Sequence, residues 1–253
     1  MRFGDLIKTE DGSYTLKHLR HGECYHSHDG AGKEAQDLYI QSSGLNQRIC
    51  NSVGTIRVLD VGLGLAYNAL STVAAWMQAE SPCAMEMLSL EIEPELVKAL
   101  ASGEFPWSEG WRKDWRKWAK CLQQLPAENS RLQSHYKFGQ KFWHCQLIHP
   151  LSSSQFNWLV IVGDARQATD LKLPNQAPWD YIWQDPFSPK TNPQMWSKEW
   201  FSLLRKECHA DTQLMSYSVA RTTKDALIAA GWSFTRITTT TRKKHWLKAQ
   251  PFR

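Results

Sequence analysis

Four short apolar segments of this chain carry an acidic residue at or next to their end, and these acids are the side chains best placed to do chemistry. They are Asp60, Glu91, Asp164 and Asp185. A carboxylate at the carboxyl end of a strand can accept hydrogen bonds from ribose hydroxyls or amino groups, and it attracts cationic groups. The spacing therefore indicates a site in which several strand ends hold a ligand with hydroxyl, amino or cationic groups.

The first acid belongs to a glycine turn, which runs from Asp60 through Gly62 to Gly64. Glycines between a strand and a helix let the backbone amides at the helix N-terminus approach a ligand closely. On its own, such a turn is also compatible with a dinucleotide. Because Asp60 lies inside the motif, where it can meet an amino or cationic group, the turn argues against a nicotinamide cofactor.

The next two acids fit the remaining parts of a nucleoside. Glu91 ends the second predicted strand, where a carboxylate can accept both ribose hydroxyls, although the adjacent Glu93 and Glu95 also allow a solvated acid at a helix entry. Asp164 follows Gly163 after the third strand and can hold an adenine amino group, although this pair is also common in turns. With the glycine turn, these acids match the pattern of S-adenosylmethionine-dependent methyltransferases, whose cofactor supplies an electrophilic methyl group.

The loop after the fourth strand is the predicted acceptor site, because it contains Asp185, Pro186, Phe187 and Pro189. The prolines stiffen the loop, the carboxylate can accept hydrogen bonds from an amine, and the phenyl ring can stack on a planar base. An amine attacks only when neutral, and a nearby carboxylate can orient it and receive its proton. This combination indicates N-methylation, although Asp-Pro is also common in turns and the phenylalanine also suits a core.

The spacing of histidines and cysteines does not indicate a metal site. His26 and His28 are two residues apart and lack a third ligand, so we expect structural or substrate contacts and no metal. The six cysteines contain no C-x-x-C pair, and we expect them to be reduced.

The segments between the four acids predict an α/β fold with a mainly parallel, doubly wound sheet. A β-branched, apolar run predicts a strand at 55–61, and further short segments predict strands at 84–91, 156–162, 179–184 and 212–218, with a closing antiparallel hairpin at 232–237 and 244–249. Helices are predicted at 69–79, 93–102, 195–206 and 222–230. Ligands of such sheets bind beyond the carboxyl ends of the strands, so the fold places all four acids at one edge.

Two segments do not follow this alternation. Residues 1–50, rich in His and Gly, are expected to form an N-terminal cap that is integrated with the domain. Residues 104–150, rich in Trp, Lys and Arg, are expected to be an insertion in a methyltransferase domain that covers residues 51–253. Because the chain has no repeat and no flexible linker, we expect one compact unit.

Composition and charge limit the class of protein and the kind of partner. The 253 residues are 42% hydrophobic and 22% charged, as in globular proteins, and we expect a cytoplasmic protein without a membrane segment or secretory signal. Residues 1–100 carry 8 Lys and Arg against 13 Asp and Glu, whereas residues 101–253 carry 22 against 12. The basic second part fits an anionic partner such as nucleic acid, although a merely solvated basic surface has the same composition.

The run from Asp185 to Trp196, DPFSPKTNPQMW, is the most specific motif of the chain. Further motifs are Thr9 to Leu16, Gly22 to Ser27 with Gly30, Ala31 and Glu34, Val58 to Gly64 with Asn68, and Arg242 to Lys244. With these motifs the chain resembles, over nearly its whole length, the methyltransferases that complete 5-methylaminomethyl-2-thiouridine at the wobble position of tRNA. That family comprises the methyltransferase half of the bifunctional MnmC proteins and the standalone MnmD proteins.

The resemblance implies a Rossmann-like methyltransferase fold and transfer of methyl from S-adenosyl-L-methionine to the primary amine of 5-aminomethyl-2-thiouridine in tRNA. It implies that Asp185 positions the amine and that Phe187 lies against the uracil. The implied cofactor contacts are Asp60, Gly62, Gly64, Asn68, Glu91 and Asp164. The implied substrate or tRNA contacts are Tyr25, His26, Arg242, Lys243 and Lys244.

Three features depart from the family. Ala66 replaces a third glycine in the cofactor turn, and Pro186 stands where a glycine is usual, which stiffens the acceptor loop. Only four residues follow Ala249, so we expect the flavin-dependent oxidase partner to be absent. The chain is then expected to depend on an aminomethyl substrate made by other enzymes.

Three other functions remain open from the sequence. Aminopropyltransferases, the polyamine synthases, share the strand-end acids, although the basic second part and the lack of an evident acidic pocket argue against them. Methyltransferases of the amino groups of adenine or cytosine also carry Asp-Pro followed by an aromatic residue, so another nucleic-acid amine is the closer rival. A noncatalytic RNA-binding module is the third, and it would bind tRNA without transferring methyl.

Overall fold

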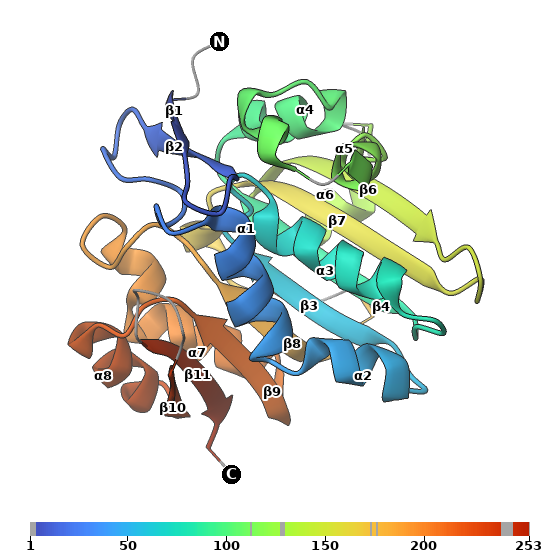
Figure 1. The fold of residues 1–253 in the computed structure, drawn as a ribbon. Helices are drawn as coiled ribbons and strands as arrows, with labels where there is room; N and C mark the ends of the chain where they lie inside the picture. Colours follow the sequence, from blue (N-terminus) through green and yellow to red (C-terminus); the bar gives the residue numbers. More distant parts are fainter. Residues whose placement is uncertain are drawn as a thin grey trace.

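A nine-stranded sheet forms the centre of the computed structural model, which describes residues 4–111, 113–126, 130–172, 174–175, 177–238 and 245–252 (Figure 1). Its parallel strands are β3 (Ile56–Val61), β4 (Met85–Glu91), β7 (Gln155–Gly163), β8 (Trp179–Gln184) and β9 (Cys208–Ser216). The antiparallel strands at its two edges are β5 (Gln123–Gln124), β6 (Gly139–Ile148), β10 (Trp232–Thr238) and β11 (His245–Pro251). The spatial order β10-β11-β9-β8-β3-β4-β7-β6-β5 confirms the predicted fold class, with its antiparallel C-terminal pair.

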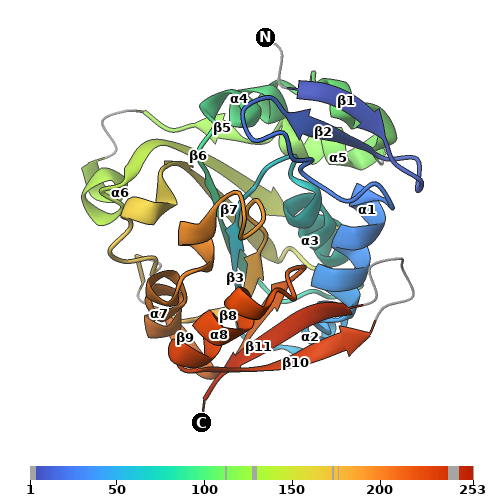
Figure 2. The same ribbon diagram turned by 90° about the vertical axis from the view of Figure 1, so that its left-hand side faces the viewer.

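Both faces of the sheet are buried, because consecutive side chains of a strand point to opposite sides. In β3, Val58 belongs to one hydrophobic core and Leu59 to the other, and Tyr181 and Ile182 of β8 divide in the same way. The first face is covered by α1 (Ala31–Glu34), the π-helix η1 (Ala35–Gln41), α2 (Leu45–Asn51), α3 (Tyr67–Gln78), α4 (Pro94–Ser102) and α5 (Lys113–Ala119). The second face is covered by α6 (Ser130–His135), α7 (Lys198–Lys206) and α8 (Arg221–Ala229), and Figure 2 shows the two layers.

The helix predicted at 195–206 is divided in two. Pro193–Trp196 forms a 3-10 turn, η4, and α7 begins only at Lys198. The division occurs at Ser197, whose hydroxyl accepts a hydrogen bond from the Trp200 amide and so caps a new helix.

The described part of the chain contains no helix with the length and apolar character of a membrane span.

The two segments that do not follow the β/α alternation are both joined closely to the sheet. The N-terminal segment begins with a hairpin of β1 (Gly4–Lys8) and β2 (Tyr14–His18), and the Asp11 carboxylate accepts a hydrogen bond from the Lys33 amide of α1 at 2.8 Å. The 104–150 segment contains the short 3-10 helix η2 (Pro106–Gly110) and supplies β5 and β6 to the sheet. Since β6 pairs with β7 along most of its length, this segment extends the central sheet instead of standing apart from it.

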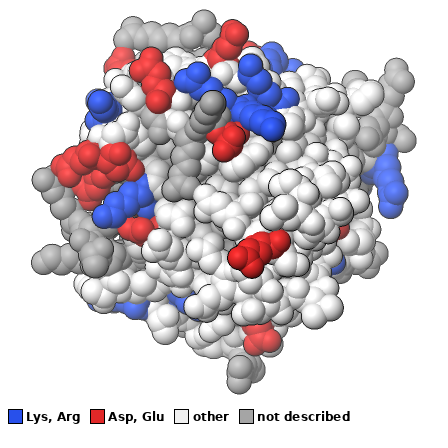
Figure 3. Space-filling model, turned by 45° about the vertical axis from the view of Figure 1, so that its right-hand side comes forward, with Lys and Arg blue, Asp and Glu red and all other residues white. Residues whose placement is uncertain are grey.

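The helix α5 is amphipathic. Trp115 is buried, with its ring 5.9 Å from Tyr67 and 5.7 Å from Trp111, whereas Arg116 and Lys117 are exposed. Figure 3 shows Lys and Arg side chains gathered at the end of the molecule where α4 and α5 lie. The tryptophans of this segment therefore serve packing, and its basic side chains face solvent.

Candidate active site

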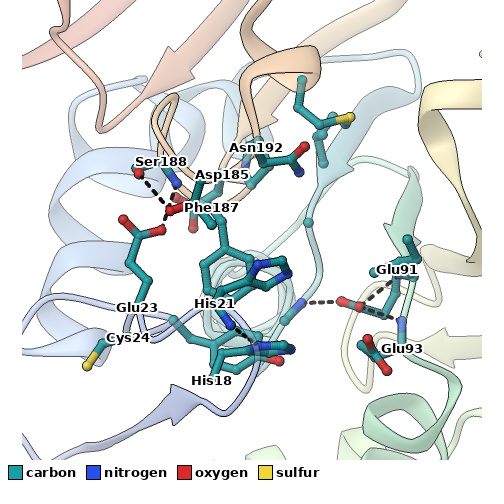
Figure 4. A pocket seen from close by; sticks show the side chains of 18 of the residues that line it. His18, His21, Glu23, Cys24, Glu91, Glu93, Asp185, Phe187, Ser188 and Asn192 are labelled. Atoms are coloured by element: carbon teal, nitrogen blue, oxygen red, sulfur yellow. Dashed lines mark hydrogen bonds between the residues drawn. The ribbon is translucent and has the colours of Figure 1, made fainter.

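A cavity of about 650 Å³ opens at the carboxyl ends of β3, β4, β7 and β8, where the N-terminal segment covers the edge of the sheet (Figure 4). Predicted site residues that line it together are Gly62, Gly64, Glu91, Asp164, Asp185, Phe187, Tyr25 and His26. The convergence follows from the topology, because the carboxyl ends of parallel strands meet at one edge. Asp60 and Asn68 lie behind the wall, and Arg242, Lys243 and Lys244 fall outside the described residues.

Glu91 fastens the glycine turn to the end of β4. Its Oε2 accepts a hydrogen bond from the Gly64 amide at 2.7 Å, and its Oε1 accepts bonds from the Ile92 and Glu93 amides at 2.8 and 2.9 Å. Burial raises the pKa of Glu91, while these amides favour the charged form. Since a carboxylate has about four acceptor positions, one position of Oε2 remains for a hydroxyl of a ligand.

Ile92 and Asp164 provide an apolar and a charged surface beside Glu91. Ile92 lines the cavity with 53% of its surface exposed, so it offers an apolar face to a planar ring. Asp164 caps the 3-10 turn η3 (Ala165–Gln167) and pairs with Arg166, with 2.7 Å to Nε and 2.7 Å to a terminal nitrogen. The guanidinium holds the pKa of Asp164 below its usual range, so the carboxylate stays charged. Sequence reasoning missed Ile92, although an isoleucine between two glutamates at a strand end is a usable signal.

Asp185 combines a fixed position with an unusual pKa. The Asn68 side-chain amide donates to its Oδ2 at 2.6 Å, and the backbone amide of Asp185 donates to the Val61 carbonyl at 3.0 Å. Burial, followed by the charge of Glu34, raises its pKa to about 8, and the Asn68 and Tyr39 side chains lower it only partly. The carboxyl group is therefore mostly protonated at neutral pH in the free protein. A cation that enters the cavity favours its charged form.

Asp60 and Asn68 act from behind the cavity wall. Asp60 is fully buried and accepts a hydrogen bond from the Ser89 hydroxyl at 2.7 Å, and burial raises its pKa to about 7. Asn68 is 3% exposed and holds Asp185. Contact of either residue with a bound cofactor stays a prediction. The role of Asn68 in positioning the acceptor loop was not predicted from the sequence.

Side chains from outside the acceptor loop, residues 185–189, form hydrogen bonds with its backbone. The Tyr217 hydroxyl donates to the Pro186 carbonyl at 2.9 Å, and the Trp196 indole donates to the Phe187 carbonyl at 2.8 Å. The Ser188 amide donates to the Glu23 carboxylate at 3.1 Å. Figure 4 shows Glu23 reaching Ser188 across the cavity edge, from a position 165 residues earlier in the chain. The loop therefore has little freedom to move away from the glycine turn.

Substitution of Gly62 by Ala is expected to destabilise the protein by about 2 kcal/mol or more. Gly62 has φ +86°, which costs an L-residue about 1–2 kcal/mol, and a Cβ there would lie 3.0 Å from the Asp185 carbonyl oxygen and 3.2 Å from the Pro186 Cα. Thermal unfolding of the variant checks this. The matched control is Gly54→Ala, whose Cβ meets open space, and equal melting temperatures for the two variants would contradict the close approach.

The Phe187 ring contacts three rings of the cap. Its centroid lies 5.3 Å from His18, 5.0 Å from His21 and 5.0 Å from Tyr25, and the two imidazoles stack 4.5 Å apart. Burial and the adjacent His21 lower the pKa of His18. Such rings give a planar base faces on which to stack. Sequence reasoning missed both histidines, because no spacing signal shows that the cap folds onto the acceptor loop.

The two predicted contacts from the cap have different surroundings. Tyr25 lies between the glycine turn and the acceptor loop, since a Cβ on Gly64 would come within 3.1 Å of its ring and the ring also contacts Phe187. His26 packs edge-on against Tyr67 at 5.0 Å, and burial lowers its pKa to about 4. Tyr25 is therefore placed beside both halves of the cavity, whereas His26 is a neutral part of the wall.

The cavity wall is acidic. It carries the carboxylates Glu23, Glu34, Glu91, Glu93, Asp164 and Asp185. The arginines on the wall are Arg20 and Arg166, and the second is paired with Asp164. The sequence argument against aminopropyl transfer, that an acidic pocket is missing, is therefore wrong, because these acids converge only in the folded chain. A cavity of this charge suits cationic groups such as a sulfonium or an ammonium.

Comparisons with known proteins identify similar methyltransferases and MnmC proteins. Residues 126–251 match a protein family described as S-adenosyl-L-methionine-dependent methyltransferase. A relative from Acidovorax sp. (strain JS42) is 27% identical over 95% of this chain, and one from Azoarcus sp. (strain BH72) is 28% identical over 90%. Both are named tRNA 5-methylaminomethyl-2-thiouridine biosynthesis bifunctional protein MnmC. This chain spans about a third of their length, 34% and 32%.

A solved structure shares the fold. The crystal structure of MNMC2 from Aquifex aeolicus superimposes with a TM-score of 0.70 at 24% sequence identity. The match covers 97% of this chain and 70% of that chain. The arrangement of sheet, cap and helices therefore recurs in a solved protein.

Proposed function

We propose, on the premise that this chain belongs to the MnmC methyltransferase family of S-adenosyl-L-methionine-dependent enzymes, that it methylates the primary amine of 5-aminomethyl-2-thiouridine in tRNA. The product is 5-methylaminomethyl-2-thiouridine at the wobble position. The observation that carries the proposal is the place of Asp185, a carboxyl on a fastened loop that faces an acid-lined cavity beside Phe187. The product named for the MnmC relatives supports the same substrate.

The residues present fit the cofactor. When bound, S-adenosyl-L-methionine supplies an electrophilic methyl group on a positively charged sulfur. The free acceptor position of Glu91 suits a ribose hydroxyl, Ile92 suits the adenine ring, and the glycine turn permits close approach of the ligand. Asp164 can accept a hydrogen bond from an amino group, in competition with Arg166.

Asp185 is proposed to hold the substrate amine. An amine must be neutral to attack, and a carboxylate close to it can orient its lone pair and receive the extra proton. The fastened loop keeps this carboxylate in place, and Phe187 offers the thiouracil ring a face for stacking. The carboxylate, the fastened loop and the phenyl ring that these roles require all come from this chain.

Neutralising the basic segment is expected to weaken tRNA binding. Replacement of Arg242, Lys243 and Lys244 by Gln removes up to three phosphate contacts, so the slope of log affinity against log salt should become shallower by about 2–3. Fluorescence anisotropy with labelled tRNA over a salt series checks this. A control that neutralises Arg221 and Lys224 of α8 reports the effect of net charge alone, and equal slopes for the two variants would contradict the prediction. The Lys and Arg side chains of residues 112–120, which include the exposed Arg116 and Lys117 of α5, are proposed as further contacts with tRNA phosphates.

Mass analysis of tRNA nucleosides from cells that lack this protein tests the function. We expect 5-aminomethyl-2-thiouridine to accumulate and its methylated product to disappear, and both changes should reverse when the protein is restored. Unchanged levels of the two nucleosides would refute the proposed substrate. Loss of a different methylated nucleoside would instead support another nucleic-acid amine.

One observation favours a second candidate. The acidic wall also suits a polyamine, so aminopropyl transfer is a specific alternative. Incubation of the protein with putrescine and decarboxylated S-adenosylmethionine, followed by chromatography of polyamines, distinguishes the two functions. Spermidine formation at a rate comparable with tRNA methylation would establish the alternative.

A further inference from the structure

Glu34, the last residue of α1, lies on the cavity wall together with Asp185, and the roles described above do not use it. The Ser27 amide donates to its Oε2 at 3.4 Å, and its own amide donates to the Gly30 carbonyl at 3.0 Å. The Asp11 carboxylate fastens the same helix through the Lys33 amide. The carboxylate of Glu34 therefore belongs to a part of the cap that is anchored to the domain.

Asp185 alone cannot satisfy a primary ammonium group. Such a group has three N–H donors, whereas the Asn68 amide already occupies Oδ2 of Asp185 at 2.6 Å. Oxygen-bearing side chains that line the cavity near Asp185 include Glu34 and Tyr217, and the Tyr217 hydroxyl donates to the Pro186 carbonyl, so its oxygen can accept. The carboxylates Glu91, Glu93 and Asp164 come from the strand ends proposed for the cofactor.

Glu34 and Asp185 line the same cavity, and their charges interact there. Glu34 is the strongest charge acting on Asp185, and both carboxylates raise the pKa of Tyr39 and of Tyr217. The groups that face Asp185 are Glu34 from α1, Tyr39 from η1, Asn68 from α3, Asp60 from β3 and Tyr217 after β9. None of these groups is cationic, so two ionised carboxylates repel one another until a cation lies between them.

We propose that Glu34 is the second carboxylate of the ammonium site, where it binds the substrate amine together with Asp185 and accepts the proton that the amine loses before methyl transfer. The inference rests on the proposed function for the identity of the amine. It adds a catalytic residue to that function and assigns the cap a chemical task.

The step balances as a proton transfer followed by a displacement. The ammonium gives one proton to the Glu34 carboxylate and becomes a neutral amine. The nitrogen lone pair forms the new N–C bond to the methyl group while the C–S bond breaks, and sulfur keeps the electron pair of that bond. The product is a secondary ammonium beside neutral S-adenosylhomocysteine, and the proton on Glu34 passes to water.

Calorimetric binding of two nucleosides to the protein saturated with S-adenosylhomocysteine tests the proposal. The probes are 5-aminomethyl-2-thiouridine and 5-methyl-2-thiouridine, which differ in the amine. Wild-type protein should bind the amine nucleoside at least about tenfold more tightly. Glu34→Gln should reduce that preference at least fivefold, and Glu34→Asp should restore part of it. Glu80→Gln, the same change at an exposed position, is the matched control and should keep the wild-type preference.

Titration of Asp185 by carboxyl carbon-13 NMR is a second readout that does not depend on turnover. Removing the charge of Glu34 should lower the pKa of Asp185 by about one unit, and Glu80→Gln should leave it unchanged. An unchanged Asp185 titration and an unchanged nucleoside preference in Glu34→Gln would overturn the role of Glu34 alone. A wild-type protein that does not prefer the amine nucleoside would overturn the proposed substrate and this role with it.

Discussion

Replacement of Asp185 by Asn is expected to reduce the rate of methyl transfer by at least about 10³-fold, because it removes both the carboxylate that can receive the proton of the amine and the charged acceptor that orients it. The shape of the loop should persist, since Asn keeps an oxygen that can accept the hydrogen bond from the Asn68 amide. Single-turnover methylation of tRNA from cells that lack the protein measures this rate. The affinities for tRNA and for S-adenosylhomocysteine should change by less than about threefold, since neither depends on this carboxylate alone.

Two comparisons make this result specific. Asp225→Asn changes an exposed aspartate on α8 and should keep the wild-type rate. A noncatalytic RNA-binding module would show no methyl transfer in any variant, whereas wild-type activity that survives in Asp185→Asn would remove the proposed role of the residue.

The same substitution is expected to stabilise the folded protein at alkaline pH. The pKa of Asp185 is about 8 in the folded chain and about 4 in an unfolded one, so folding binds a proton between these values. Stability attributable to Asp185 is therefore present below pH 4 and is lost as the pH rises to about 8. An asparagine side chain does not ionise, so Asp185→Asn does not lose this stability. Its free energy of unfolding should exceed that of the wild type by about 2 kcal/mol or more at pH 8 and by little near pH 4. Chemical unfolding at both pH values checks this, and an equal difference at the two would contradict the raised pKa.

Substitution of Glu91 by Gln is expected to weaken the binding of S-adenosyl-L-methionine by about 10–100-fold. The remaining acceptor position on Oε2 is charged, and a hydrogen bond to a charged acceptor contributes about 1.5–3 kcal/mol. A carboxamide also turns an NH₂ group toward backbone amides that now donate to Glu91, so the glycine turn should loosen. Isothermal titration calorimetry below the unfolding transition measures the affinity.

A partly exposed glutamate on the neighbouring helix provides the control for this prediction. Glu95→Gln makes the same chemical change at a residue paired with Lys98 on the surface and should leave cofactor affinity within about twofold. Equal affinities for Glu91→Gln and Glu95→Gln would place the ribose elsewhere in the cavity.

The fold could be predicted where local pattern and topology agree. The strand at 179–184 was predicted at its observed bounds, and that at 84–91 to within one residue, because short, mostly apolar runs that end in acidic residues are distinctive in a sheet buried on both faces. The helix at 195–206 was predicted too long, since its apolar period continues across Ser197 while the hydroxyl of that residue caps a new helix. The strand β6 was missed, because it lies in the Trp-, Lys- and Arg-rich segment 104–150 and its own sequence does not reveal its pairing with β7.

Some residues of the candidate site could be predicted from the sequence and others could not. Glu91, Asp164 and Asp185 were predictable together, because parallel strands bring their carboxyl ends to one edge. The residues His18, His21, Glu23 and Glu34 gained no catalytic or binding role from the sequence, because the return of the cap onto a loop 165 residues away has no periodic signature. Asp60 and Asn68 were predicted as cofactor contacts, and the folded chain buries both behind the wall.

A crystal structure of this protein with S-adenosylhomocysteine and 5-aminomethyl-2-thiouridine tests the central claim most directly. We predict that the ribose lies on Glu91, that the aminomethyl nitrogen lies within hydrogen-bond distance of Asp185, and that the sulfur points at that nitrogen. A ligand sulfur that lies far from Asp185, or an amine that contacts other groups of the cavity, would contradict the account.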